Sequence, residues 1–337
     1  MSKCLRLFVL SFIFFLSGES IARQSSYGDF ELLVTTAIKL SEEALFDAKF
    51  EQALAYLDTS YFQQFDSYQP QEEVQLVLQR QRVEGFRNLL FQIKSNREEM
   101  LAELLSYQPY SNTFDTSIQA NYYLALSSAY RSIGEVDSSQ HFVAKASSLY
   151  TELRDFRKIS EIRASEISRR QNALLREGKK QEILAMIPEY REEIEFSAEY
   201  SKYALAYNTR HLGQIHRRQT EDMEEALKLF QRSLELRVEI NFRPFVPASY
   251  SSVGDVYLAM GDYEKAIEAY NKSSELAEEI GFIRYQLYPN IQIGTIYFEQ
   301  GDKSQAEVFF QKAFNNARLN KHEKGMSEAK RKLESLR

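Results

Sequence analysis

The four histidines are the first residues to test for chemistry, because imidazole serves both as a metal ligand and as a general base. They are His141, His211, His216 and His322, and neither a His-x3-His pair nor a cysteine cluster accompanies them. His211 and His216 are five residues apart, which is a poor spacing for two ligands of one metal on a helix. The sequence favours a packed structural role for His216 and predicts neither a metal nor a cofactor.

Paired carboxylates and phosphate loops are the other common carriers of catalysis. Glu192 with Glu193, and Glu278 with Glu279, are adjacent acidic pairs of the kind that is frequent on solvated helix faces. The sequence contains no Gly-x-Ser-x-Gly elbow and no Gly-rich phosphate loop. No catalytic residue is therefore predicted, and an enzyme is the least favoured function class.

The elements that position polar side chains in this sequence are helices with a repeated spacing. Tyr250, Val253, Gly254 and Tyr257 fall at i, i+3, i+4 and i+7, which places them on one helical face. Helix formers dominate the composition, with only 12 Gly and 6 Pro. We expect that face to be buried, and the whole chain to be all-α.

A second helix follows a short turn. Gly261 and Asp262 form a helix-breaking pair, and Ala266 and Tyr270 begin a new apolar stripe four residues apart. The two helices are expected to turn back on each other, and the small side chains of Gly254 and Ala266 would let them approach closely.

The same arrangement occurs in three successive copies. Their second-helix alanines, Ala226, Ala266 and Ala306, are separated by 40 residues each. The first of these copies has one extra residue between His216 and Ala226. The expected structural positions are Gly213, Ala226, Tyr250, Gly254, Tyr257, Ala266, Tyr270, Gly294, Tyr297, Ala306 and Phe310.

This pattern resembles the tetratricopeptide repeat, whose signature is an aromatic residue, x2, Leu-Gly, x2, Tyr, then Ala, x3, Phe. Because the period exceeds 34 residues, the resemblance is to the longer-period branch of the family, as in kinesin light chain. It implies a right-handed superhelical solenoid of stacked antiparallel helix hairpins with a concave surface.

The repeats are expected to occupy most of the chain. After a leader over 23–29, we expect about seven repeats in 30–320, strongest in 206–320. A polar helix over 321–337 would cap the last hairpin, since terminal repeats need one wet face. The equivalent second-helix positions are Ala53, Met100, Ser139, Ile183, Ala226, Ala266 and Ala306.

The N-terminus has the pattern of a secretory signal peptide. Lys3 and Arg6 precede an apolar run of ten residues, Leu7 to Leu16, and small residues lead up to Ala22. Ten residues are too few to span a bilayer. We predict a signal peptide over 1–22, cleavage after Ala22 and an exported, periplasmic or secreted protein, with a retained anchor as the alternative.

Charge and cysteine content limit the functions and the stabilising features expected of the mature chain. Loss of the signal removes two basic residues and one acidic residue, which changes the formal charge from −6 to −7. A mildly acidic exported protein is not expected to bind nucleic acid. Since no cysteine remains and no second apolar run reaches 18 residues, we expect packing alone to hold the fold and no integral membrane segment.

Ligands of tetratricopeptide proteins usually lie on the concave face, which is formed by the first helix of each hairpin. Carried over to this chain, that face is rich in Arg, Asn and Gln in its middle copies. Its C-terminal end is smaller and more apolar, for example at Leu258 and Phe298. The partner-binding residues that the resemblance implies are Asn121, Arg131, Asn172, Arg176, Arg210, Gln214, Arg217 and Arg218.

Two interpretations of these arginines carry equal weight. Guanidinium forks bind carboxylates, and amides hold peptide backbones, so the groove is expected to take an acidic peptide segment. Alternatively, the arginines pair with neighbouring Glu residues on their own helices.

The favoured function is a non-catalytic exported scaffold or adaptor that binds a protein or peptide partner. The alternative is a sensory or accessory component of a bacterial signalling system that acts through a separate membrane partner. Partner identity and oligomeric state stay open.

Overall fold

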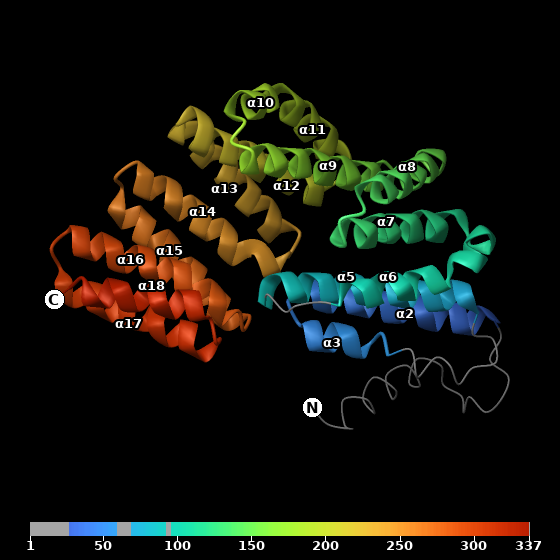
Figure 1. The fold of residues 1–337 in the computed structure, drawn as a ribbon, viewed down its shortest axis with the longest axis horizontal. Coiled ribbons are helices and arrows are strands. Elements are labelled where there is room, and N and C mark those ends of the chain that lie inside the picture. Colours follow the sequence, from blue (N-terminus) through green and yellow to red (C-terminus); the bar gives the residue numbers. More distant parts are fainter. Residues whose placement is uncertain (1–26, 59–68, 92–95, 337) are drawn as a thin grey trace. The chain divides into compact units, whose positions relative to one another are not determined.

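The computed structural model describes residues 27–58, 69–91 and 96–336. Throughout these ranges the regular structure is helical and no β-strand occurs (Figure 1), which confirms the predicted all-α class. The predicted signal peptide over 1–22 lies outside the described residues. The first described helix, α2, begins at Tyr27, within the expected leader.

Contacts between helices divide the chain into two units, one ending at Asp155 and the other beginning at Phe156. In the first unit α2 packs on α5, α6 packs on α7, and α7 packs on α8. The elements of this unit are α2 (Tyr27–Phe46), α3 (Phe50–Ala55), α5 (Pro70–Phe91), α6 (Arg97–Ser106), a 3-10 turn η1 (Gln108–Thr113), α7 (Thr116–Ser132) and α8 (Val136–Glu152).

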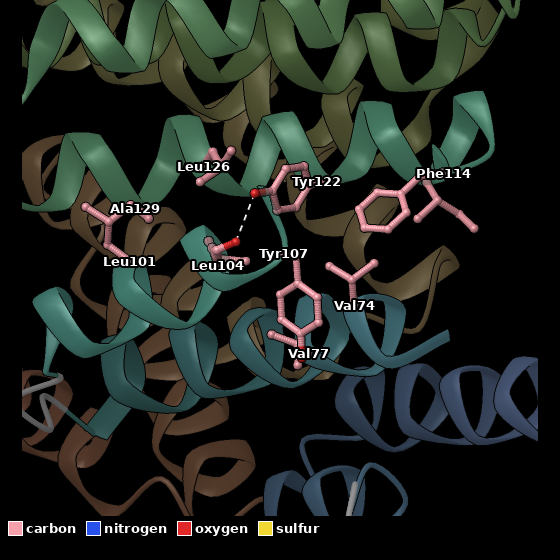
Figure 2. Packing of buried hydrophobic residues seen from close by; sticks show 10 residues of the cluster. Val74, Val77, Leu101, Leu104, Tyr107, Phe114, Tyr122, Leu126 and Ala129 are labelled. Carbon is pink, nitrogen blue, oxygen red and sulfur yellow. Dashed lines mark hydrogen bonds between the residues drawn. The ribbon is translucent and has the colours of Figure 1, made fainter. Parts of the chain in front are cut away.

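Buried aromatic and aliphatic side chains hold the first unit together (Figure 2). Tyr122 on α7 is fully buried, and its hydroxyl donates a hydrogen bond of 2.9 Å to the backbone oxygen of Leu104 at the end of α6. Val77 of α5 and Leu126 of α7 belong to the same cluster. The hydrogen bond satisfies the polar atom of a buried tyrosine and links α7 to the last turn of α6.

The second unit is a series of antiparallel hairpins. Each hairpin packs on the next, with α13 on α14 and α15 on α16 (Figure 1). Its elements are α9 (Phe156–Arg176), α10 (Lys180–Ala185), α11 (Ile187–Tyr200), α12 (Lys202–Ile215), the π-helical turn η2 (His216–Thr220), α13 (Met223–Glu239), a 3-10 turn η3 (Arg243–Phe245), α14 (Val246–Ala259), α15 (Tyr263–Glu279), a 3-10 turn η4 (Ile283–Gln286), α16 (Leu287–Glu299), α17 (Lys303–Leu319) and α18 (Glu323–Glu334).

The turns inside the last hairpins follow from two residue types. Gly261 and Gly301 have φ of 79° and 85°, a left-handed conformation that glycine adopts without strain. The aspartate after each glycine caps the next helix, and Asp262 accepts a hydrogen bond from the backbone N–H of Lys265 at 3.2 Å. The Gly-Asp pair therefore ends one helix and begins the next.

In each of the three C-terminal hairpins, a glycine of the first helix lies against an aromatic ring of the second helix. The pairs are Gly213 with Phe230, Gly254 with Tyr270, and Gly294 with Phe310. A Cβ atom added to these glycines would lie 3.2, 2.8 and 2.6 Å, respectively, from the nearest ring atom. Three glycines thus occupy matching places in neighbouring hairpins, and each admits a ring where a side chain would collide.

The remaining repeat positions differ in burial. Ala226, Ala266 and Ala306 are fully buried. The tyrosines of the first helices, Tyr250, Tyr257 and Tyr297, are only half-buried. The alanines and glycines therefore allow close helix contact, and Tyr257 and Tyr297 pack against the buried clusters.

Two features differ from the simplest hairpin pattern. The second arm of the fourth hairpin is broken into α10 and α11 at Met186, and Pro188 stands in the first turn of α11 where it needs no backbone donor. The expected terminal helix is α18, which packs on α17 and buries Gly325 and Ala329.

Candidate partner-binding surface

The eight predicted partner-binding residues are divided between the two units. Asn121 and Arg131 lie on α7 in the first unit. The other six lie on α9, on α12 and in the turn after α12, all in the second unit.

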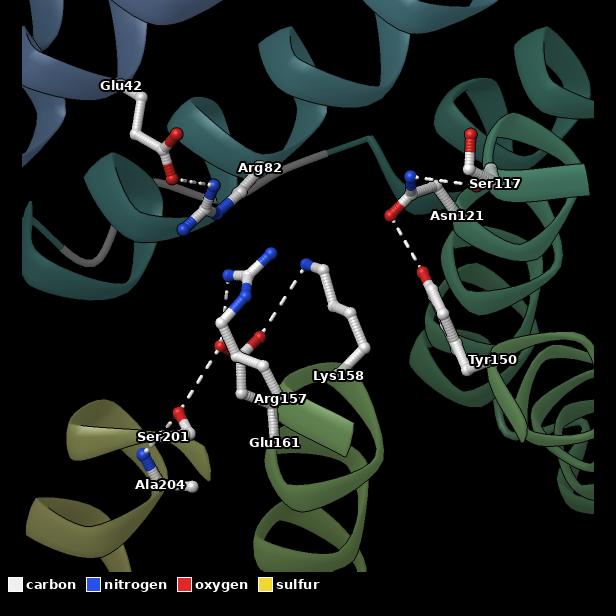
Figure 3. Close-up of polar contacts among 10 residues, drawn as sticks. All are labelled: Glu42, Arg82, Ser117, Asn121, Tyr150, Arg157, Lys158, Glu161, Ser201 and Ala204. Atoms are coloured by element: carbon white, nitrogen blue, oxygen red, sulfur yellow. Dashed lines mark hydrogen bonds and ion pairs between the residues drawn. The ribbon is translucent and has the colours of Figure 1, made fainter. Parts of the chain in front are cut away.

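The amide of Asn121 is used within the first unit. Its Nδ2 donates to the backbone oxygen of Ser117 at 2.9 Å, and its Oδ1 accepts the Tyr150 hydroxyl at 2.7 Å (Figure 3). Arg131 is half-buried, and burial lowers its pKa. Asn121 therefore links α7 to α8.

In the second unit, α9 packs against α12, and polar side chains fix their relation. Ser201 caps α12 by accepting the backbone N–H of Ala204 at 3.2 Å, and its hydroxyl donates to Glu161 on α9 at 3.5 Å (Figure 3). Nearer the middle of the helices, the Ser168 hydroxyl donates to that of Tyr207 at 3.1 Å. Side chains of α9 and α12 consequently share one surface.

Asn172 and Arg176 lie four and eight residues beyond Ser168, so they continue its stripe along α9. Both side chains are exposed. Within the ranges that the structure describes, neither makes a hydrogen bond or an ion pair through its side chain. They are therefore available to a partner.

Arg210 and Gln214 form the corresponding stripe on α12, one turn apart and both half-buried. Arg218 follows in the π-helical turn and is exposed. The π turn takes up the extra residue of this copy, because a π-helical turn holds one residue more than an α-helical turn.

Arg217 is paired inside the unit. Its Nη1 lies 3.1 Å from Oδ2 of Asp255 on α14. Oδ1 of the same carboxylate accepts the hydroxyls of Tyr270 at 2.9 Å and Tyr288 at 2.7 Å. Asp255 therefore joins η2, α14, α15 and α16. For Arg217, the structure supports pairing with a local carboxylate, here on the next hairpin.

Two of the four histidines, His211 and His216, are buried, whereas His141 is exposed. His211 is buried and shares Oε1 of Gln171 with the Tyr190 hydroxyl, at 2.9 and 2.8 Å. Since that oxygen can only accept, Nδ1 of His211 carries the proton. Burial, followed by the charges of Arg210 and Arg237, lowers the pKa of His211 to about 3. His216 is also buried. In the described part of the chain, acidic, histidine and cysteine side chains form no group able to hold a metal ion.

Arg237 is a residue that the sequence reasoning missed. It lies on α13, the second helix of its hairpin, and only 6% of its surface is exposed. Burial, followed by the charge of Arg210, lowers its pKa to about 10. A signal was present in the sequence, since Arg237 stands eleven residues after Ala226, where the next copies have Ala277 and Ala317.

Arg210 has a similar environment. Burial lowers its pKa, the charges of Arg218 and Arg217 lower it further, and Tyr207 and Tyr285 act in the opposite direction. Among the described residues, Arg210 makes no hydrogen bond or ion pair through its side chain. The surface around α12 is thus a concentration of positive charge in a chain whose formal net charge is −6.

Comparison with known proteins identifies the repeats. Two tetratricopeptide repeat profiles match the chain, one over residues 203–279 and one over residues 289–318. These segments contain the hairpins from α12 to α17. No curated protein sequence matches the chain. Among the described residues, no helix combines the length and apolar character needed to cross a membrane.

Solved structures of similar fold cover most of the chain. One is a signal transduction ATPase with numerous domains (STAND) protein with a tetratricopeptide repeat sensor, from Pyrococcus horikoshii. It has a TM-score of 0.51 and 13% identity, over 94% of this chain and 54% of that one, so this chain spans about half its length. Another is aspartyl phosphate phosphatase F from Bacillus subtilis, with a TM-score of 0.51 and 12% identity, over 92% and 80% of the two chains. At these identities the similarity shows the fold alone.

Proposed function

We propose that this chain is a non-catalytic interaction protein, and that its second unit binds an acidic protein or peptide segment on the first-helix surface of consecutive hairpins. The observation that carries the proposal is the charge around α12. Arg210, Arg217, Arg218 and Arg237 gather there, and Asp255 pairs with only one of them, Arg217. Such a surface attracts carboxylates, because charge-assisted hydrogen bonds to guanidinium groups are stronger than neutral ones.

The geometry supports an extended contact. Asp255 on α14 connects Arg217 of the turn after α12 with Tyr288 of α16, so consecutive hairpins present neighbouring side chains on one face of the second unit. The exposed Asn172 and Arg176 extend the surface onto α9. A peptide lying across the helices would meet arginines and amides in succession.

Three further features belong to the proposal. The hairpins of residues 206–320 recur every 40 residues as one longer-period repeat array. Residues 1–22 direct export and are removed after Ala22. The protein therefore meets its partner outside the cytoplasm. N-terminal sequencing of the protein from cell fractions tests export, and recovery of the chain with Met1 intact would contradict cleavage.

The second candidate is a sensory component that acts through a separate membrane partner. The repeat segment of the Pyrococcus horikoshii protein is described as a sensor, which gives this role a parallel in a similar fold. Both functions would use the same surface. Co-purification from intact cells separates them, since a sensory component should recover a membrane protein.

A selection from random displayed peptides tests the binding proposal without a known partner. With the full chain immobilised, we expect the enriched peptides to be rich in Asp and Glu. The double change Arg210→Gln and Arg218→Gln should remove that enrichment. The matched control, Arg318→Gln with Arg331→Gln, removes two exposed charges of the same unit and should retain it. Enriched peptides without acidic residues, or no enrichment, would contradict the proposal.

A further inference from the structure

Repeat packing does not require an arginine at position 237. The equivalent residues of the next two hairpins, Ala277 and Ala317, are 0% and 1% exposed, so a methyl group fills the position there. Arg237 is buried in the same place on α13. Burying a guanidinium charge costs free energy, and an alanine fills the same position in two other hairpins. Packing of the repeat therefore does not explain the arginine.

The neighbours of Arg237 leave its charge uncompensated. Its Nη1 donates to Oγ of Ser249 at 2.5 Å and to the backbone oxygen of Phe245 at 3.3 Å, and the guanidinium lies 5.7 Å from the centre of the Phe245 ring. All of these partners are uncharged. In contrast, the guanidinium of Arg163 in the same unit lies 2.6 Å from the buried carboxylate of Glu193.

Arg210 increases the local charge. It comes from α12, while Arg237 comes from α13, and the two helices pack together. Burial, and then the charge of Arg210, lower the pKa of Arg237, and the charges of both arginines add to the effect of burial in lowering the pKa of His211. Among the described residues, no carboxylate forms an ion pair with either arginine. The hydroxyl groups of Tyr207 and Tyr285 act on the charge of both arginines, so the surroundings of this cationic pair are polar.

We propose that Arg210 and Arg237 form a binding site for a single oxyanion, which in the peptide complex is a carboxylate of the bound segment. The identification of the oxyanion as a peptide carboxylate rests on the function proposed above. Each guanidinium carries five N–H donors, and those of Arg237 are only partly used, so the pair can donate several hydrogen bonds to one anion. The negative charge of the anion compensates the two arginines, which form no ion pair with a carboxylate among the described residues.

The site predicts an unusual relation between stability and binding. If Arg237 were only a hydrogen-bonding link from α13 to Phe245 and Ser249, its loss would weaken the fold. If Arg237 instead serves to bind an anion, an uncharged side chain of similar size should leave the anion-free fold as stable or more stable, because the free-energy cost of burying the charge disappears. The same change should abolish stabilisation by anions.

The test compares unfolding midpoints of the full chain in urea with added sodium succinate, a carboxylate probe, or sodium phosphate. Sodium chloride at matched ionic strength provides the reference. The variants are Arg237→Met and Arg210→Gln. The control is Arg232→Met, which removes an exposed arginine from the same helix. General salt effects act on all variants alike, so the difference between variants isolates the site.

We expect a saturable rise of the midpoint with succinate in the wild type and in Arg232→Met, which is absent from Arg237→Met and Arg210→Gln. Without the probe, Arg237→Met should unfold at an equal or higher urea concentration than the wild type. An equal response of all variants, or a loss of stability in Arg237→Met without a selective anion effect, would overturn the site. A selective response to phosphate alone would keep the oxyanion site and refute the peptide carboxylate. A failed peptide selection with a selective succinate response would refute the proposed function and leave the site standing.

Discussion

The glycines that face aromatic rings provide a graded test of hairpin packing. Replacing a helical glycine with alanine gains roughly 1 kcal/mol of helix propensity when nothing else changes. Gly85 on α5 represents that case, because nothing lies within 4 Å of its added Cβ. At Gly294 the Cβ would lie 2.6 Å from the fully buried ring of Phe310, and overpacking costs about 1–3 kcal/mol.

The expected free energies of unfolding follow from this balance. Gly85→Ala should stabilise its unit by about 1 kcal/mol, and Gly294→Ala should destabilise its unit by about 1–2 kcal/mol. Gly254→Ala should lie near the latter, and Gly213→Ala, where the contact is 3.2 Å, should be close to neutral. Amide hydrogen exchange by mass spectrometry measures opening helix by helix, and so reports each unit separately. Equal stabilisation by Gly85→Ala and Gly294→Ala would refute the ring contact.

Two further predictions concern α12 and the turn after it. His211 has a folded-state pKa of about 3, below its ordinary value of 6.5. Its neutral side chain therefore stabilises the folded state fully above pH 6.5. This stabilisation falls at lower pH, where the unfolded chain takes up a proton and the folded chain does not. Between pH 7 and pH 5 this costs ~2 kcal/mol, and urea unfolding of His211→Gln should lack that component; an identical pH dependence in the two proteins would contradict it. Glu221 adopts φ of 59° in a turn where later hairpins have Gly261 and Gly301, so Glu221→Gly should raise the unfolding midpoint by the equivalent of about 1 kcal/mol, and a lowered midpoint would contradict the strain.

The hairpins could be predicted from the sequence because their causes are local. Gly261 and Asp262 predict a left-handed residue followed by a helix cap, and the spacing of Ala266 and Tyr270 indicates a buried helical face. The structure has helices on both sides of this turn. The break between α10 and α11 also has a local cause, since Pro188 stands in the first turn of α11.

The partners of the arginines could not be predicted in the same way. The pairing of Arg217 with Asp255 depends on how one hairpin stacks on the next and on the π turn that takes up the extra residue. Sequence spacing along one helix contains neither fact. Arg237 is marked in the sequence, because a charged residue stands where two neighbouring copies have alanine, but it lies on a second helix, outside the first-helix face that the resemblance implies for ligands.

The most direct measurement of the central claim is the affinity of one selected peptide and of its amide counterpart, in which every Asp and Glu becomes Asn or Gln. Titration calorimetry with the full chain gives both values. A hydrogen bond between charged groups contributes about 1.5–3 kcal/mol, so the amide peptide should bind at least about tenfold more weakly. The difference should disappear in Arg210→Gln with Arg218→Gln. Equal affinities of the two peptides for the wild-type chain would contradict recognition of an acidic segment by these arginines.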